Sequence, residues 1–188
     1  MIKNKMKPKE KLKEEIEIPE GINASIDDGE IIMKKDSSEL KRRLNSKINV
    51  KIEGNKIIIE SGTTRTEKKI FGTMKAHIKN MIKGLTEVFK YKLQISTVHF
   101  PISVEIDKAN NQLIVKNFLG EKKDRKIKLI SGVDINVDKE FIEIKSIDIE
   151  KAGQCAANIE KGTRVRKKDR RVFQDGIFII QKPNRRFL

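Results

Sequence analysis

The chain has 188 residues, 37% of them hydrophobic, which is enough for one medium domain or two small ones. Lys and Arg total 42 against 27 Asp and Glu, so the net charge is +15 and the pI is near 9.8. This excess favours a polyanionic partner, nucleic acid above all, over charge that serves solubility alone. The single cysteine excludes an intramolecular disulfide and a multi-cysteine zinc site, and it favours a reducing compartment.

Residues 1–15 are expected to form a disordered basic arm. Six lysines occupy alternate positions from Lys3 to Lys13, with Glu10 as the one acid among them. The segment has no apolar stretch, which argues against a secretory signal. Its lack of arginine, together with Glu10, argues against an organelle transit peptide. Whether the arm contacts a partner or stays solvated is left open.

Residues 16–99 are predicted to form a first α+β unit. Short runs of alternating apolar and polar residues are joined by Asp28-Gly29 and Gly54-Asn55, which are typical of hairpin turns. Together these runs predict one small antiparallel sheet.

An amphipathic helix is predicted to follow at 66–85, where apolar residues recur every three or four positions and lysines occupy the outer face. Thr66 is the candidate cap. No capping box is expected, because Glu67 stands one position after Thr66 rather than three. The period then returns to two over residues 89–96, which predicts a strand.

An internal repeat divides the chain near Phe100. Ile18-Pro19 is echoed by Phe100-Pro101 after 82 residues, Ile-Asn-Val at 48–50 recurs at 135–137 after 87 residues, and the helix near Thr66 is matched by one near Asp148 after 82 residues. Three markers at similar offsets indicate two copies of one β-rich unit that ends in a helix. The predicted fold class is therefore α+β, with two tandem duplicated units, each a small, mostly antiparallel sheet packed with one helix. The second unit covers residues 100–183.

The second helix is predicted over residues 148–160, with Asp148 as its cap. Its small and apolar positions place Cys155 in the core rather than in a nucleophilic site. The two histidines, His77 and His99, have no ligand-like spacing and are expected to be surface or packing residues.

Several motifs resemble those of a known family. They are Asn-Met-Ile-Lys-Gly-Leu-Thr at 80–86 with Phe-Lys-Tyr-Lys at 89–92, His-Phe-Pro-Ile at 99–102, and Asn-Phe-Leu-Gly-Glu-Lys at 117–122. A carboxy-terminal set completes them: Gln154, Lys167, Asp169, Arg171, Phe173, Asp175, Gly176 and Ile177. Across about residues 16–180 the chain resembles the universal large-subunit ribosomal protein of the L-six family, in its eukaryotic and archaeal form.

The resemblance implies two duplicated α+β units, joined by a long shared strand, in a component of the large ribosomal subunit. It implies binding to ribosomal RNA mainly through the second unit, near the translation-factor-binding region and the sarcin-ricin element, with neighbouring large-subunit proteins as further partners. A cytoplasmic location in ribosomes follows, with assembly in the nucleolus if the source is eukaryotic. No membrane, cofactor, metal or small-molecule substrate is expected.

The strongest local charge lies after the second helix. Residues 161–188 carry ten Lys and Arg and two Asp, a net charge of +8 that exceeds half of the chain's total. Arginine binds phosphate through a planar fork and lysine as a mobile point charge. The residues assigned to RNA contacts are Lys161, Arg164, Arg166, Lys167, Lys168, Arg170, Arg171, Arg185 and Arg186.

Other residues of this segment have structural interpretations. Asp175-Gly176 is interpreted as a turn into an apolar strand. Phe173 and Phe178 are interpreted as core anchors rather than stacking platforms. Residues 184–188 are expected to form a tail. The lysines of the first helix and of residues 122–128 form either a second RNA-facing surface or an ordinary solvated face.

Two other classes of protein compete with this interpretation. A free RNA-binding regulator would carry the same basic segment. An RNA-processing enzyme would need convergent acids or a phosphate-binding loop, and the sequence shows no Gly-rich phosphate loop and no catalytic motif of the common hydrolase families. The sequence therefore predicts a protein that is not an enzyme.

Overall fold

The structure, a computed structural model, describes residues 12–186 and shows two compact units that meet between Glu87 and Val88. Most of the predicted basic arm, residues 1–11, lies outside the described part, as do residues 187–188. The arm was predicted to extend to residue 15, and this is wrong for its last residues. Residues 12–15 belong to the first strand, β1 (Leu12–Glu17), which pairs along its length with a later strand.

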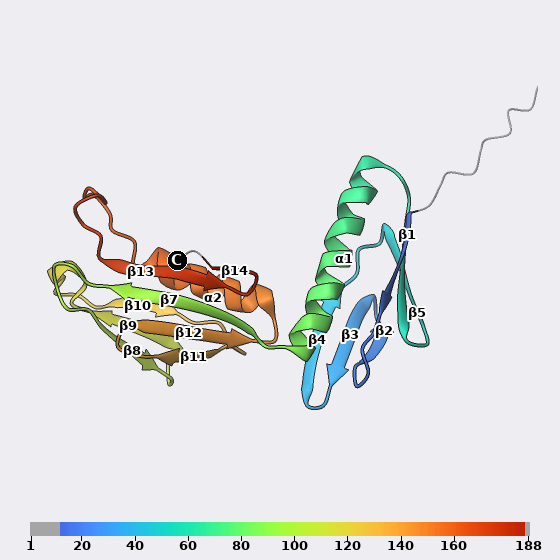
Figure 1. The fold of residues 1–188 in the computed structure, drawn as a ribbon, viewed down its shortest axis with the longest axis horizontal. Helices are drawn as coiled ribbons and strands as arrows, with labels where there is room; N and C mark the ends of the chain where they lie inside the picture. Colours follow the sequence, from blue (N-terminus) through green and yellow to red (C-terminus); the bar gives the residue numbers. More distant parts are fainter. Residues whose placement is uncertain (1–11, 187–188) are drawn as a thin grey trace, which may run out of the picture. The chain divides into compact units, whose positions relative to one another are not determined.

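The first unit contains six strands and one helix (Figure 1). After β1 they are β2 (Asn23–Asp27), β3 (Glu30–Lys35), β4 (Ser38–Arg43), β5 (Ile48–Glu53), β6 (Lys56–Ser61) and α1 (Arg65–Thr86). The strands form two antiparallel sheets, β1-β6-β5 and β2-β3-β4, where the sequence predicts one. Local alternation identifies the hairpins, but it does not reveal that β1 pairs Leu12 with Ser61 at the far end of β6.

Helix α1 begins with a capping box that the sequence prediction excluded. The Thr64 hydroxyl accepts a hydrogen bond from the backbone N–H of Glu67 at 3.3 Å, and the Glu67 carboxylate accepts one from the backbone N–H of Thr64 at 3.0 Å. The predicted cap, Thr66, instead lies in the first turn. The cap was misplaced because the first apolar residue of the repeating pattern is Ile70, six residues after the actual cap.

The second unit contains eight strands, a short 3-10 helix and one α-helix (Figure 1). They are β7 (Phe89–Ser96), β8 (Ser103–Asp107), β9 (Gln112–Lys116), η1 (Phe118–Gly120), β10 (Arg125–Lys128), β11 (Asp134–Val137), β12 (Phe141–Ser146), α2 (Ile149–Gly162), β13 (Gly176–Lys182) and β14 (Arg185–Arg186). Five strands form the sheet β11-β12-β7-β13-β14, and three form the sheet β10-β9-β8.

Strand β7 lies at the centre of the five-stranded sheet. It pairs with β12 on one edge, Tyr91 opposite Ile144, and with β13 on the other, Ile95 opposite Ile177. The predicted alternation is confirmed, since every second residue from Phe89 is buried. The prediction that this strand belongs to the first unit is corrected, because both of its neighbours are strands of the second unit and the boundary lies before it.

The predicted duplication is confirmed by the strand order. The sheets β5-β6-β1 and β2-β3-β4 of the first unit match β11-β12-β7 and β8-β9-β10 of the second, and each unit has one helix after its sixth strand. The second unit adds β13 and β14 beyond β7. The predicted tail therefore begins too early, because Arg185 of β14 pairs with Lys182 of β13.

Helix α2 packs on the five-stranded sheet through small residues. Asp148 caps it as predicted, its carboxylate accepting the backbone N–H of Glu150 at 2.9 Å. Cys155 is buried in the core, as expected, and its burial raises the pKa of the thiol. The helix backbone at Gly162 lies close to Ile127, where an added Cβ would be 2.6 Å from its side chain.

Within residues 12–186 neither α-helix combines the length and hydrophobicity needed to span a membrane.

The capping box gives a testable prediction. Thr64→Ala is expected to lower the free energy of unfolding by about 1 kcal/mol, because it leaves the Glu67 N–H without its acceptor. Urea unfolding followed by circular dichroism measures this loss. Thr66→Ala is the matched control and is expected to be neutral or slightly stabilising, since alanine has the higher helix propensity. An equal loss in both variants would contradict the assigned cap.

Candidate nucleic-acid interface

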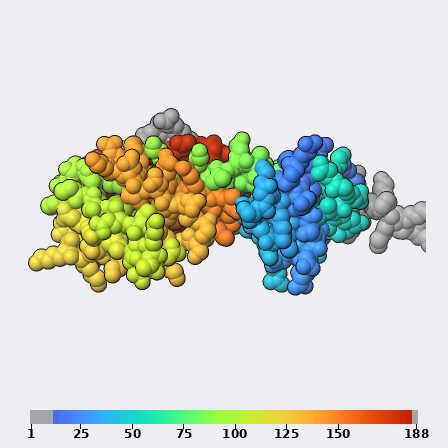
Figure 2. Space-filling model, turned by 90° about the horizontal axis from the view of Figure 1, so that it is seen from below, coloured from blue at the N-terminus to red at the C-terminus, as the bar shows by residue number. Residues whose placement is uncertain are grey.

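The basic residues assigned from the sequence gather on one loop, residues 163–175, here called the basic loop. It connects α2 to β13 and extends past the end of the sheet (Figure 1). It carries six exposed cations: Arg164, Arg166, Lys167, Lys168, Arg170 and Arg171. Lys161 is exposed in the last turn of α2 and adjoins them. In Figure 2 the orange part of the chain, which includes α2, is exposed on the face of the second unit that is shown.

Two of the assigned residues lie elsewhere. Arg185 and Arg186 belong to β14, which pairs with Gln181 and Lys182 at the end of β13 farthest from the basic loop. The structure therefore brings together seven of the nine assigned residues and leaves these two at the opposite end of one strand.

The start of the basic loop is fixed by buried Thr163. Its hydroxyl donates to the backbone carbonyl of Ile159 at 3.1 Å and accepts the backbone N–H of Ile177 at 3.2 Å. One side chain thus joins the end of α2 to the start of β13. Val165, two residues on, is also buried. The loop is therefore held by the core at its first residues.

Arg125 supports the same part of the loop from β10. Its guanidinium donates to the backbone carbonyls of Gly162 at 3.1 Å and Arg164 at 3.2 Å. Its other nitrogens bind the Glu121 carboxylate, Nε at 2.8 Å and Nη2 at 2.5 Å, and its guanidinium carbon lies 3.9 Å from the ring centroid of Phe118. Arg125 lies within the 122–128 run whose role was open, and here it acts as an internal support of the loop.

The end of the basic loop is fixed by the buried carboxylate of Asp175. One oxygen accepts the backbone N–H groups of Val98 at 2.8 Å and His99 at 2.9 Å, and the other lies 2.6 Å from Nδ1 of His99. Asp175 was interpreted as a turn residue, and this is corrected. The side chain is fully buried and ties the loop to the segment that follows β7.

These contacts set the acidity of Asp175. Burial by itself raises the pKa of the carboxyl group, but the hydrogen bonds from the backbone and side chain of His99 and from the backbone of Val98 outweigh it and hold the pKa at about 2, below the ordinary 3.8. The carboxylate therefore stays charged at pH values well above 2.

The two phenylalanines of this region differ in role. Phe173 packs against the core cluster, and its ring stacks on His99 with centroids 5.0 Å apart, while the Lys168 ammonium lies 4.4 Å from its centroid. The predicted role of Phe173 as an anchor is confirmed, and so is the packing role of His99. Phe178 is half-buried and lines a cavity under the loop.

The other basic segments are partly neutralised within the molecule. On α1, Lys75 and Lys79 lie 2.6 Å and 3.6 Å from the Glu14 carboxylate on β1. In the 122–128 run, Arg125 is an internal support, while Lys122, Lys123, Lys126 and Lys128 are exposed. The basic loop differs from α1 because, among its six cations, the described residues give an ion pair to Arg171 alone, with Asp169 at 3.6 Å.

Comparison with known proteins agrees with this architecture. The family model described as Ribosomal protein L6 matches residues 18–88 and 100–176. The chain is 40% identical over 173 residues to the protein named Large ribosomal subunit protein uL6 of Methanococcus vannielii, covering 91% of this chain and 94% of that protein. It is 44% identical over 170 residues to the protein of the same name from Staphylothermus marinus, covering 88% and 92%.

The chain belongs to the ribosomal protein L6 family. The resemblance seen in the sequence is thereby confirmed, and the two relatives come from archaea, as the eukaryotic and archaeal form predicts. The first matched segment covers most of the first unit, and the second runs through most of the second unit and contains the whole basic loop, while β7 lies between the two segments.

Four residues that support the basic loop were not identified as supports from the sequence: Thr163, Arg125, Asp175 and His99. Asp175 and His99 are 76 residues apart, and Arg125 is 37 residues from the carbonyl of Gly162 that it binds. No local spacing signals such contacts. The one available hint was chemical, since Asp175 is one of two acids in a strongly basic segment.

The Asp175 contacts predict a specific pH dependence. A pKa lowered from 3.8 to about 2 stabilises the folded state by about 2 kcal/mol at pH values above 4, and this contribution is lost as the pH falls toward 2. Asp175→Asn is expected to be less stable at pH 7 by about this amount and to lack this part of the pH dependence. Chemical denaturation at several pH values between 2 and 7 measures both quantities.

Asp169→Asn is the matched control, because it changes an exposed carboxylate of the same loop. It is expected to keep the acid-dependent loss of the unchanged protein. If Asp175→Asn lost stability between pH 4 and pH 2 as steeply as the unchanged protein, the assigned contacts would be wrong.

Proposed function

We propose that this chain is a structural component of the large ribosomal subunit that binds ribosomal RNA through the basic loop and Lys161. Membership of the L6 family and identities of 40% and 44% to proteins named as large-subunit components, over nearly the full length of each, support the assignment to the subunit. The observation that supports the RNA contact is the loop itself, where six exposed cations are presented on a backbone fixed at both ends.

The chemistry of the loop suits folded RNA. The deep, narrow major groove of A-form RNA excludes side chains, so proteins contact phosphates and 2′-hydroxyl groups instead. Arginine forms paired hydrogen bonds with phosphate, and four of the six loop cations are arginines: Arg164, Arg166, Arg170 and Arg171. Anchoring by Thr163 and Asp175 lowers the conformational entropy that the loop loses on binding.

The proposal extends to the surroundings of the protein. Its partners are large-subunit ribosomal RNA and neighbouring large-subunit proteins. Within the subunit it lies near the translation-factor-binding region and the sarcin-ricin element. Its cellular location is the cytoplasm, within ribosomes. Family membership supports a structural role over that of an RNA-processing enzyme or a free RNA-binding regulator. Arg185 contributes a second, separate contact at the far end of β13, and Arg186, whose side chain lies outside the described part of the structure, is assigned to the same contact from the sequence.

The loop assignment is tested with Arg170→Ala combined with Arg171→Ala. Binding to large subunits that lack the protein, measured by co-sedimentation at increasing KCl, is expected to weaken. The slope of log affinity against log salt is expected to fall by about 0.7–0.9 for each phosphate group that the variant no longer binds. A subunit protein also stays with the particle through a moderate salt wash, whereas a free regulator does not.

Lys34→Ala combined with Lys41→Ala is the matched control. It removes the same charge from β3 and β4 of the first unit, where both lysines pair with Glu39. This control is expected to keep the salt slope of the unchanged protein. An unchanged slope in the arginine variant would remove the loop from the interface.

A further inference from the structure

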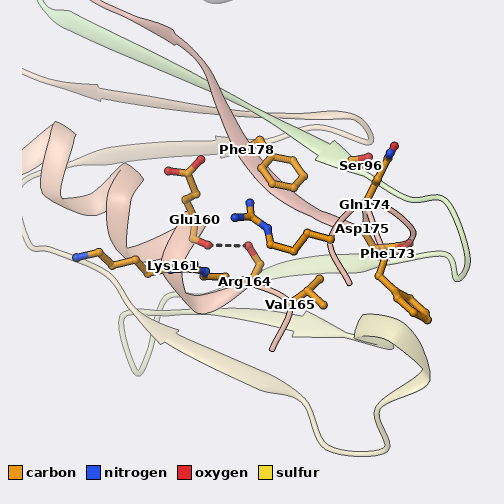
Figure 3. Close-up of a pocket in the computed structure, with 11 residues that line it drawn as sticks. Ser96, Glu160, Lys161, Arg164, Val165, Phe173, Gln174, Asp175 and Phe178 are labelled. Atoms are coloured by element: carbon orange, nitrogen blue, oxygen red, sulfur yellow. Dashed lines mark hydrogen bonds between the residues drawn. The ribbon is translucent and has the colours of Figure 1, made fainter. Parts of the chain in front are cut away.

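A cavity of about 540 Å³ lies beneath the basic loop, between the last turn of α2, the end of β7 and the start of β13. Figure 3 shows the residues that line it, which come from all of these segments and from the basic loop. Its volume falls within the range of about 300–1,000 Å³ that is typical of small-ligand sites. The question is which part of an RNA chain such a cavity fits.

The apolar wall of the cavity is formed by Phe178 and Val165. Phe178 is half-buried, and its ring lies against the backbone of Gly176, where an added Cβ would come within 2.9 Å of it. The ring is therefore held in place by the strand that carries it. Phe173 also borders the cavity, but its ring is already in contact with His99 and Lys168. Phe178 is thus the aromatic surface on which a base can stack.

The polar wall contains a carboxylate, which is unusual beside so many cations. Glu160 accepts the backbone N–H of Ile179 through Oε1 at 3.3 Å, and this contact positions its carboxylate at the cavity. Asp175 borders the cavity too, but its two oxygens are engaged by Val98 and His99. A carboxylate repels phosphate and accepts N–H donors. At this wall of the cavity Glu160 therefore disfavours a phosphate and favours a hydrogen-bond donor, such as the N–H groups on the edge of a base.

Two cations at the same cavity are suited to bind the phosphate groups of a nucleotide. Arg164 and Arg170 line it and are exposed, so their guanidinium groups can bind the phosphates on either side of an inserted nucleotide. Among the bases, guanine presents two neighbouring N–H donors on its Watson–Crick edge, which match the two oxygens of one carboxylate.

We propose that this cavity receives a single unstacked guanosine of the bound RNA, with its base on Phe178, its Watson–Crick edge on Glu160 and its flanking phosphates on Arg164 and Arg170. The inference rests on the proposed function and deepens it, because it gives the basic loop one base-specific contact in addition to its phosphate contacts. Sequence-specific recognition of RNA usually reads such unpaired, splayed-out bases.

The probes for the test are four fluorescein-labelled RNA hexamers, five uridines with guanosine, adenosine, cytidine or uridine at the third position. Fluorescence anisotropy with the full chain measures their affinities at one salt concentration. The guanosine hexamer is expected to bind most tightly. Phe178→Leu is expected to weaken its binding roughly 5- to 150-fold, because the base can no longer stack on an aromatic ring.

Phe141→Leu is the matched control. Phe141 is a half-buried phenylalanine on β12 with the Lys92 ammonium 4.0 Å from its centroid, and it does not line the cavity. Its replacement is expected to leave all four affinities unchanged.

Glu160→Gln is the second test variant, since the amide oxygen can still accept the Ile179 N–H. This variant is expected to bind the guanosine and adenosine hexamers with equal affinity. It tests the guanosine preference on its own if Phe178→Leu does not fold.

Equal binding of all four hexamers by the unchanged protein would overturn the proposal, because it would show binding by charge alone. A guanosine preference that survives Glu160→Gln, or a weakening in Phe178→Leu no larger than in Phe141→Leu, would overturn it as well. These outcomes are separable from a failure of the proposed function. If the proposed function is wrong, Arg170→Ala with Arg171→Ala leaves the salt dependence of binding to the large subunit unchanged. If only the guanosine proposal is wrong, that salt dependence still changes and the hexamer affinities alone contradict the proposal.

Discussion

The pairing of β13 with β7 is the constraint on which the rest of the second unit depends. Through it the chain after α2 returns to the centre of the sheet, with Ile177 opposite Ile95, and the basic loop becomes a closed connection rather than a free end. Thr163 fixes the loop where it leaves α2, and Asp175 fixes it where it enters β13. A loop held at both ends loses less conformational entropy on binding than a free tail would.

Acidic side chains do much of this anchoring in a strongly basic region. Asp175 binds His99, Glu121 binds Arg125, and Glu160 binds the backbone N–H of Ile179. Each of these three acids contacts a specific donor of the fold, and among the described residues Arg171 is the one loop cation with an ion pair, to Asp169. The two units share one plan, and the strand pair β13-β14 with its preceding loop is what the second unit adds to it. The basic loop is therefore part of what distinguishes the second unit from the first.

The sequence predicted the elements better than their partners. Alternation and turn residues located the strands, and the repeat located the duplication, because both are local or periodic signals. The assignment of Phe89–Ser96 to the first unit was wrong. The alternation of apolar and polar residues identifies a strand, but it does not indicate which sheet the strand joins. The exposed cations of the site were identified from charge. Their supports, Arg125 and Asp175, were not, because they act across 37 and 76 residues of sequence.

The central claim is that the basic loop is the RNA-docking surface of this protein, and amine-reactive footprinting of intact large subunits tests it most directly. Acetylation of Lys161, Lys167 and Lys168, all exposed in the folded chain, is quantified by mass spectrometry for the free protein and for the protein within the subunit. The account predicts strong protection of these three lysines in the subunit, and recovery of their reactivity after ribonuclease digestion. Equal reactivity in the free and assembled protein would contradict it.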